Sequence, residues 1–274
     1  MSVRIAPEFV TSSFVHEGHH LVYDDYGTGA RVIVYLHGLL LDSELNRGLA
    51  AELADAGNRV VLMDLLGHGR SDRPLHAAEY RIDSYAEQVI GLLDHLGVQQ
   101  AVLGGLSLGA NVSLFAASEH PDRVRGLVLE MPVLEWAVPS AAAVFVPLLL
   151  AAHYGRPVMA PLSAILNRIP DSPFGPLNSL VHAAGLPPRV MSAVLHGVLV
   201  GPVAPTQDDR AEIVAPTLIL AHRSDLIHPF EDASRLAELM TSARLERTRS
   251  MVELRLCPQR LTACISEFLD QVWG

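Results

Sequence analysis

One serine of the chain stands in a setting that suits nucleophilic catalysis. The segment Gly105-Leu106-Ser107-Leu108-Gly109 follows a short apolar run and precedes a run of small residues. Where a G-x-S-x-G segment joins a buried strand to a helix, it forms a sharp turn that exposes the serine hydroxyl. The two glycines are needed because strand and helix approach closely there. This context favours a nucleophile over an ordinary strand-to-helix turn.

The elements that must position this serine follow an alternating pattern. Runs of Val, Ile and Leu alternate with longer amphipathic stretches, which is typical of a mostly parallel sheet covered by helices. The chain, at 274 residues, suffices for one large α/β domain with an insertion. After antiparallel strands up to Tyr26, we expect strands over 31–36, 59–63, 101–103, 124–129, 216–221 and 244–248, and helices over 44–56, 83–96, 231–240 and 258–272.

The alternation is interrupted between residues 131 and 212. Proline and glycine recur there among apolar runs, and no strand pattern is evident. We therefore predict a helical cap over 131–212, inserted into a core domain made of 1–130 and 213–274. The most apolar stretch, 137–152, is shorter than a bilayer requires and contains prolines, so it is predicted to be a buried helix.

Composition excludes several classes of protein. The net charge of −10 argues against nucleic-acid binding, which requires clustered cations. The two cysteines, Cys257 and Cys264, are expected in the last helix, too far apart to form a disulfide, and they offer no metal cluster. No apolar leader and no phosphate-binding or dinucleotide motif is evident, so we expect a cytoplasmic protein without metal, cofactor or membrane span. The sequence does not indicate an oligomeric state.

Four segments in order resemble the α/β-hydrolase superfamily. They are His37-Gly38, the run from Asp64 to Asp72, the turn at Ser107, and His222-Arg223-Ser224-Asp225 after a late strand. The resemblance implies a mostly parallel eight-stranded sheet flanked by helices. It makes Ser107 the nucleophile and Asp225 the acid of a triad, although an Asp at such a position is also a common turn or cap residue.

The same resemblance assigns two backbone donors. The N–H groups of Leu39 and Leu108 would form an oxyanion hole for the negative oxygen of a tetrahedral intermediate. In the run from Asp64 to Asp72, Arg70 and Asp72 are expected to fix the loop by pairing rather than to contact substrate.

The general base is missing from its usual place. The family carries a histidine after the last strand, whereas this chain has no histidine beyond His228. Met251 falls closest to the usual position, and a thioether is not a useful proton acceptor at neutral pH.

Three hypotheses follow. The first recruits His228, whose loop borders the site, as the base, with His153, His182 and His196 as weaker alternatives. The second uses a carboxylate as a poorer base, either Glu253 or Glu130, and Glu130 also occupies an alternative acid position of some relatives. The third is a degenerate site that binds an apolar ligand or performs lyase-like or oxygenase-like chemistry.

The predicted cap bears on the substrate. Its apolar runs mostly serve helix packing, but caps of this superfamily cover the pocket, so the resemblance implies an apolar chamber. We therefore expect an esterase-like serine hydrolase acting on a small or medium hydrophobic ester, lactone or thioester.

Overall fold

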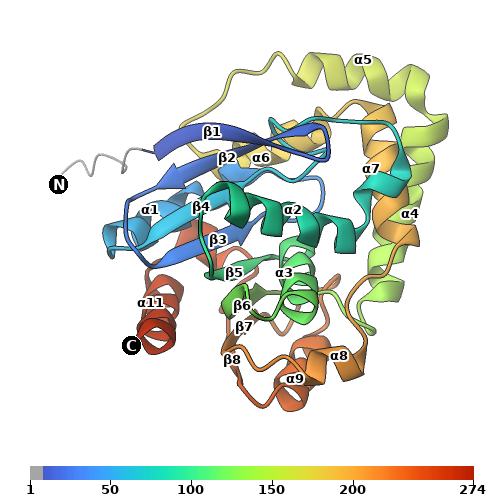
Figure 1. Ribbon diagram of the computed structural model, residues 1–274. Helices are drawn as coiled ribbons and strands as arrows, with labels where there is room; N and C mark the ends of the chain where they lie inside the picture. The colour runs from blue at the N-terminus through green and yellow to red at the C-terminus, as the bar shows by residue number, and fades with distance from the viewer. Residues whose placement is uncertain (1–8) are drawn as a thin grey trace.

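One mixed sheet organises the chain. The computed structural model describes residues 9–274, so the expectations for residues 1–8 lie outside it (Figure 1). The sheet has eight strands in the order β1-β2-β4-β3-β5-β6-β7-β8. The two antiparallel pairs are β1 with β2 and β2 with β4, and the other pairs are parallel. The predicted fold class, a mostly parallel eight-stranded sheet of the α/β-hydrolase type, is confirmed.

The strands lie close to their predicted positions. They are β1 (Phe9–His16), β2 (His19–Tyr26), β3 (Val32–Leu36), β4 (Arg59–Met63), β5 (Ala101–Leu106), β6 (Val124–Glu130), β7 (Thr217–Ala221) and β8 (Ala243–Arg247). Strands β3 and β7 are buried at every position. Helices cover both faces of a parallel sheet, so its central strands are apolar at successive positions rather than at alternate ones.

Helices form a layer on each side of the sheet (Figure 1). One face packs on α1 (Arg47–Asp55) and α11 (Gln259–Trp273), and the other on α2 (Ile82–His95), α3 (Leu108–Glu119) and α9 (Phe230–Leu239). Short helices lie at η1 (Ser43–Asn46), η2 (Ala77–Tyr80) and α10 (Glu253–Leu256). The sheet therefore lies between two apolar cores. The carboxyl ends of the parallel strands lie at the same edge of the sheet.

Two local predictions need correction. The helix expected over 44–56 is divided into η1 and α1. Cys257 follows α10 and so lies outside the last helix, and both cysteines are free.

Five helices fill the predicted insertion between β6 and β7. They are α4 (Val138–Tyr154), α5 (Arg156–Leu166), α6 (Gly175–Ala184), α7 (Pro188–Val200) and α8 (Gln207–Ala211). The prediction of a buried helix over 137–152 is right about the helix and wrong about its burial, since Ala152 alone is buried within α4. Apolarity shows that a segment avoids water, but it does not show whether a partner covers it.

A buried ion pair fastens the end of β6 to α10. The Glu130 carboxylate accepts two hydrogen bonds from the Arg255 guanidinium, both 2.8 Å, and one from the Tyr35 hydroxyl at 2.9 Å. Both charged side chains are at least 95 % buried, with 2 % and 5 % exposed. Burial, followed by the Glu130 charge, raises the pKa of Tyr35 well above its usual value, so its hydroxyl remains a donor.

This network gives a prediction for stability. Replacing Arg255→Met leaves the Glu130 charge buried without a cation, which should lower the free energy of unfolding by about 3–5 kcal/mol. Adding Glu130→Gln removes that charge while preserving an acceptor for Tyr35, so the double variant should recover part of the loss. Urea unfolding measures both, and a double variant no more stable than Arg255→Met would contradict the interpretation.

Candidate active site

A strained turn presents Ser107 at the junction of β5 and α3. Its φ of +52° lies in the left-handed region, where a non-glycine residue needs strong support from its surroundings. Close packing of β3 against both sides of the turn provides this support. A Cβ on Gly105 would lie 2.7 Å from the Leu36 carbonyl oxygen, and one on Gly109 would lie 2.7 Å from the Leu36 side chain. The Ser107 N–H also donates to the Glu130 carbonyl at 2.8 Å. The serine is partly exposed and its side chain caps no helix.

His228 faces this serine. Its Nε2 lies 3.0 Å from the Ser107 Oγ, and its Nδ1 lies 2.8 Å from the Asp225 Oδ2. The other Asp225 oxygen accepts the backbone N–H groups of Ile227 and His228, which fixes the loop after β7. A hydroxyl, an imidazole and a carboxylate thus form one hydrogen-bonded line, with the imidazole only three residues beyond Asp225.

The carboxylate of this line is held in its ionised form. Burial by itself raises the pKa of Asp225, but the hydrogen bonds from the His228 ring and from two backbone N–H groups outweigh it. The net result is a pKa below the usual value. At neutral pH an anion therefore faces Nδ1, which leaves Nε2 as the acceptor for the serine proton.

Two backbone donors border the same space as the serine hydroxyl. Leu39 and Leu108 both line the cavity that contains Ser107. Within residues 9–274, neither backbone N–H has a hydrogen-bond acceptor in the protein. Leu108 begins α3, so the partial positive charge of that helix end adds to its donor strength. The neighbouring Leu40 has a φ of +64° and turns the chain sharply beside Leu39.

The alternative bases lie elsewhere. Glu130 is held by Arg255 and Tyr35 on the sheet face that α1 and α11 cover. Glu253 binds Arg260, which holds the pKa of its carboxyl below the usual range. Neither carboxylate contacts Ser107 in the described part of the chain, so the second hypothesis was wrong about their placement.

The weaker histidine alternatives also have other surroundings. His153 lies 3.4 Å from Ser192, His182 lies between two carboxylates, and His196 is exposed on α7. Met251 is 47 % exposed in the loop after β8. Among the thirteen histidines, the structure brings His228 to Ser107.

A small apolar cavity adjoins the serine. Its volume is about 160 Å³. The core supplies Leu39, Ile82, Ser107, Leu108 and Asn111. The rest of the lining comes from α4, α7 and the ends of the cap: Val133, Val138, Ala141, Ala142, Phe145, Val146, Val198, Leu199 and Val203. No charged side chain lines it within the described residues. The expected apolar chamber is therefore present beneath the cap.

Asn111 was missed by the sequence analysis. It lies one turn beyond Ser107 on α3, and its amide NH₂ donates to the carbonyls of Val133 and Val203 at 2.6 Å each. Its carbonyl oxygen accepts the Val133 N–H at 3.0 Å. One side chain thus binds both ends of the cap beside the nucleophile. Its only sequence signal is a polar residue one turn after the serine, within the apolar first half of α3.

Asp232 provides a second attachment for the cap. Its carboxylate accepts the backbone N–H groups of Leu134, Trp136 and Ala137 at 2.9–3.0 Å, just before α4 begins. Asp232 lies on α9, directly after the loop that carries His228. The base and the entry of the cap are therefore held by one short stretch of chain.

The loop after β4 is fixed by charge pairs, as predicted. Arg70 binds Asp64 at 2.8 Å and Asp24 at 2.8 Å, and the Asp72 carboxylate accepts the His20 N–H at 2.7 Å. Burial lowers the pKa of His68 in this loop to about 3, so its ring stays neutral. None of these side chains lines the cavity at Ser107.

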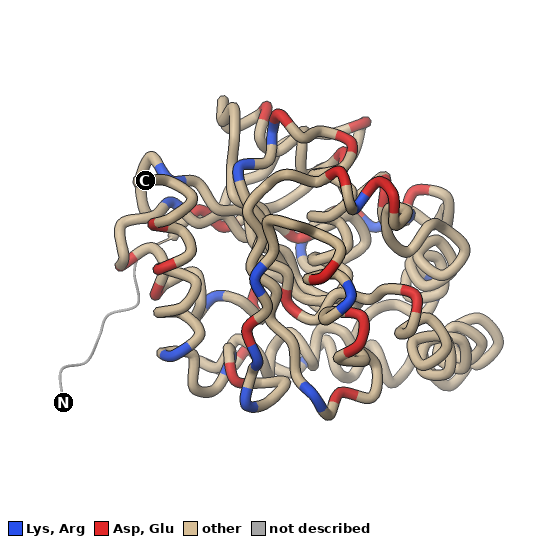
Figure 2. Tube along the Cα trace, turned by 90° about the horizontal axis from the view of Figure 1, so that it is seen from below, with Lys and Arg blue, Asp and Glu red and all other residues tan. Residues whose placement is uncertain are grey.

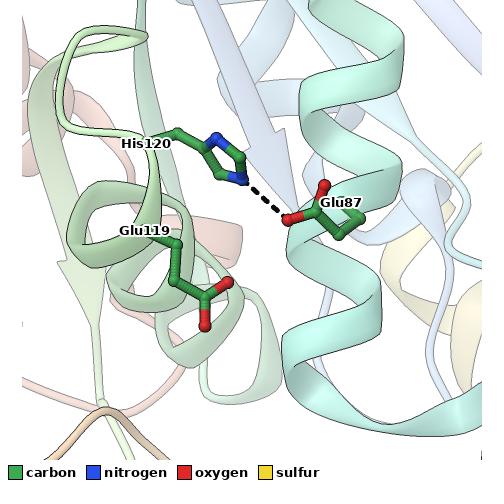
Figure 3. Close-up of side chains that lie close together, drawn as sticks. All are labelled: Glu87, Glu119 and His120. Atoms are coloured by element: carbon green, nitrogen blue, oxygen red, sulfur yellow. Dashed lines mark hydrogen bonds and ion pairs between the residues drawn. The ribbon is translucent and has the colours of Figure 1, made fainter.

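One group of side chains outside the site has donor atoms suited to a metal ion. Glu87, Glu119 and His120 come from α2 and the end of α3, with one donor atom of each within 4.8 Å of the others (Figure 3). His120 lies 2.7 Å from Glu87, an ordinary surface ion pair. The cluster is at the opposite end of α3 from Ser107, so it takes no part in the site described above.

Comparison with known proteins places the chain in a family. A family model described as "alpha/beta hydrolase fold" matches residues 31–179, which is more than half of the chain. The chain belongs to the α/β-hydrolase family.

Named relatives share this class. A haloalkane dehalogenase of Mycolicibacterium paratuberculosis is 37 % identical over 40 % of this chain and 37 % of its own length. A 2-hydroxymuconate semialdehyde hydrolase of Pseudomonas putida is 33 % identical over 68 % of this chain and 67 % of its own. The matches to the first curated relatives span only between a third and somewhat over half of those proteins.

A solved structure extends the likeness over the fold. The thermophilic esterase of Thermogutta terrifontis has a TM-score of 0.74 and 25 % identity, covering 97 % of this chain and 99 % of its own.

His182 fastens the cap to the loop that carries Leu39. This α6 residue lies 2.7 Å from Asp42 and 3.0 Å from Asp171. The Asp42 N–H in turn donates to Ser179 of the same helix at 3.0 Å. Burial alone lowers the pKa of His182, but the hydrogen bond and charge of Asp42, followed by those of Asp171, raise it above its ordinary value.

This contact predicts a pH-dependent stability. Because the folded protein binds the His182 proton more tightly than the unfolded chain, its contribution is full below the ordinary pKa of about 6.5 and is lost as pH rises through the folded value. His182→Asn should therefore reduce the free energy of unfolding more at mildly acidic than at mildly alkaline pH. Urea unfolding at both pH values checks this, with exposed His196→Asn as the control. An equal loss at both values would contradict it.

Proposed function

We propose that this protein is a serine hydrolase that cleaves small or medium-sized hydrophobic esters through an acyl-enzyme on Ser107. The observation that carries the proposal is the 3.0 Å contact between Ser107 Oγ and His228 Nε2, with Asp225 behind the ring. A serine hydroxyl is a weak nucleophile until an adjacent base takes its proton. In this proposal His228 is that base, and it lies three residues after Asp225.

The proposed reaction begins at the hydroxyl. As Oγ attacks the ester carbonyl, His228 Nε2 takes its proton, and the Asp225 carboxylate stabilises the resulting imidazolium through Nδ1–H. The N–H groups of Leu39 and Leu108 donate to the oxygen that becomes negative, and loss of one such donor typically costs about 2.7–4 kcal/mol. His228 then protonates the leaving alcohol oxygen. Water, deprotonated by the same nitrogen, releases the acid from Ser107.

The chamber supports a neutral, apolar acyl group. An anion enclosed by its aliphatic and aromatic lining would lose hydration without gaining a cation. A volume of about 160 Å³ favours short acyl chains. Lactones and thioesters present the same carbonyl to Ser107 and remain within the proposal. The resemblance to an esterase over the whole fold supports the same class.

The role of His228 gives a direct test. His228→Ala should lower kcat for a short-chain nitrophenyl ester by at least about a thousandfold, because the serine loses its proton acceptor. Labelling of Ser107 by a fluorophosphonate probe should slow with it, and Ser107→Ala should abolish both signals. Ester kinetics and mass spectrometry of the labelled protein give the measurements.

The matched control for this test is His222→Ala. His222 lies on the same loop, but it binds the Arg249 carbonyl and the Ser224 N–H rather than the serine. This variant should retain ester cleavage. Turnover unchanged by Ser107→Ala would overturn the proposal in favour of a protein that only binds its ligand, and full activity in His228→Ala would overturn the assignment of the base.

Chamber size predicts selectivity. Phe145→Ala enlarges the space beside Ser107, so the ratio of kcat/KM for a six-carbon to a two-carbon acyl ester should rise by roughly tenfold. Val144→Ala is the control, because Val144 is the neighbouring residue of α4 and does not line the chamber. An unchanged ratio in Phe145→Ala would mean that the acyl chain binds elsewhere.

A further inference from the structure

We propose that the outer surface of the cap docks on an anionic lipid surface. The surface is formed by the end of α4, all of α5 and the turn that follows. Its apolar members, each about half exposed or more, are Leu150, Tyr154, Val158, Leu162, Ile165 and Ile169. We call this set the cap stripe.

The cap stripe has the geometry of a helix face. Val158, Leu162, Ile165 and Ile169 follow one another at intervals of four, three and four residues, which places them on one side of α5 and its continuation. Val158, Leu162 and Ile165 are 75 %, 53 % and 58 % exposed. The buried residue of α5 is Ser163, whose hydroxyl donates to the Gly185 carbonyl. Met159 packs against the core on the same side as Ser163. The large apolar residues Val158, Leu162 and Ile165 face away from the protein, whereas an ordinary surface helix buries such residues.

Charge separates the outer part of the cap, residues 136–206, from the rest of the molecule. This segment contains three arginines and one acidic residue, Asp171, in a chain whose net charge is −10. Figure 2 shows the charged residues concentrated over the rest of the trace and sparse along α4 to α7. Asp171 already contacts His182. This segment therefore carries an excess of positive charge, whereas the whole cap, 131–212, contains four arginines and five acidic residues.

Two of the arginines flank the cap stripe. Arg156 begins α5 and Arg168 follows its end, and within the described residues neither forms an ion pair. An apolar helix face bordered by unpaired cations is the pattern of a helix that lies in the headgroup region of a membrane. No helix of the described chain could span a bilayer by itself; α4 with α5, and α6 with α7, meet the length and composition test only as sharply bent pairs.

The charge pattern favours a lipid surface over a second copy of the chain. In a two-fold dimer the same patch faces itself, so Arg156 and Arg168 would approach their own counterparts. Anionic headgroups would instead neutralise both. The α4 helix also lines the substrate chamber through Phe145 and Val146, so the docked surface would adjoin the chamber roof.

Co-sedimentation with lipid vesicles tests this proposal without a catalytic readout. The full chain should bind vesicles of phosphatidylcholine mixed with phosphatidylglycerol and bind pure phosphatidylcholine weakly. Leu162→Glu with Ile165→Glu should lower the partition coefficient by at least about tenfold. Arg156→Gln with Arg168→Gln should lower it roughly thirtyfold on the anionic vesicles.

The control substitution is Val214→Glu, at an equally accessible apolar residue outside the cap, which is 81 % exposed. It should leave vesicle binding unchanged, while circular dichroism confirms that every variant is folded. Absence of binding to the mixed vesicles, or unchanged binding by the cap-stripe variants, would overturn the proposal. A dimer detected by light scattering that Leu162→Glu dissociates would overturn it too, and would assign the surface to a second copy.

Discussion

The main chain at Ser107 is held at a φ of +52° by the close approach of β5, β3 and α3, and the arrangement of the site follows from that turn. Only glycine fits at 105 and 109, because the carbonyl of Leu36 lies where a side chain would begin. A strained residue of this kind costs of order 1–3 kcal/mol and persists only where packing determines it. The gain is a hydroxyl that projects from the sheet edge beside the unpaired N–H of Leu108.

The loop after β7 completes the line of polar groups in an unusual way. Asp225 accepts backbone hydrogen bonds of its own loop with one oxygen and contacts the His228 ring with the other, so the two side chains are held together. In the usual α/β-hydrolase pattern, the acid and the histidine come from different loops. Here the loop after β8 is free of that requirement, and its Glu253 serves an ion pair with Arg260 instead.

The cap is bound to the same machinery at its attachment points. Asn111 holds both of its ends one turn from Ser107, and Asp232 holds the start of α4 one turn after the loop of His228. Chamber and reactive groups are thereby kept in fixed relation. The outer side of the cap is under no such constraint, and its exposed apolar stripe and unpaired arginines set it apart from the acidic remainder of the chain.

The sequence by itself determined the fold and the sharp turn that presents Ser107, because strand periodicity and the glycines around Ser107 are local requirements that leave a local pattern. It determined the apolar character of the cap, but not that α4 and α5 would stay exposed, since burial depends on a partner. It did not decide among thirteen histidines and two carboxylates for the group beside the serine hydroxyl. Only the tertiary structure decided that, because the 3.0 Å between His228 and Ser107 spans 121 residues of chain and is set by the order of parallel strands in the sheet.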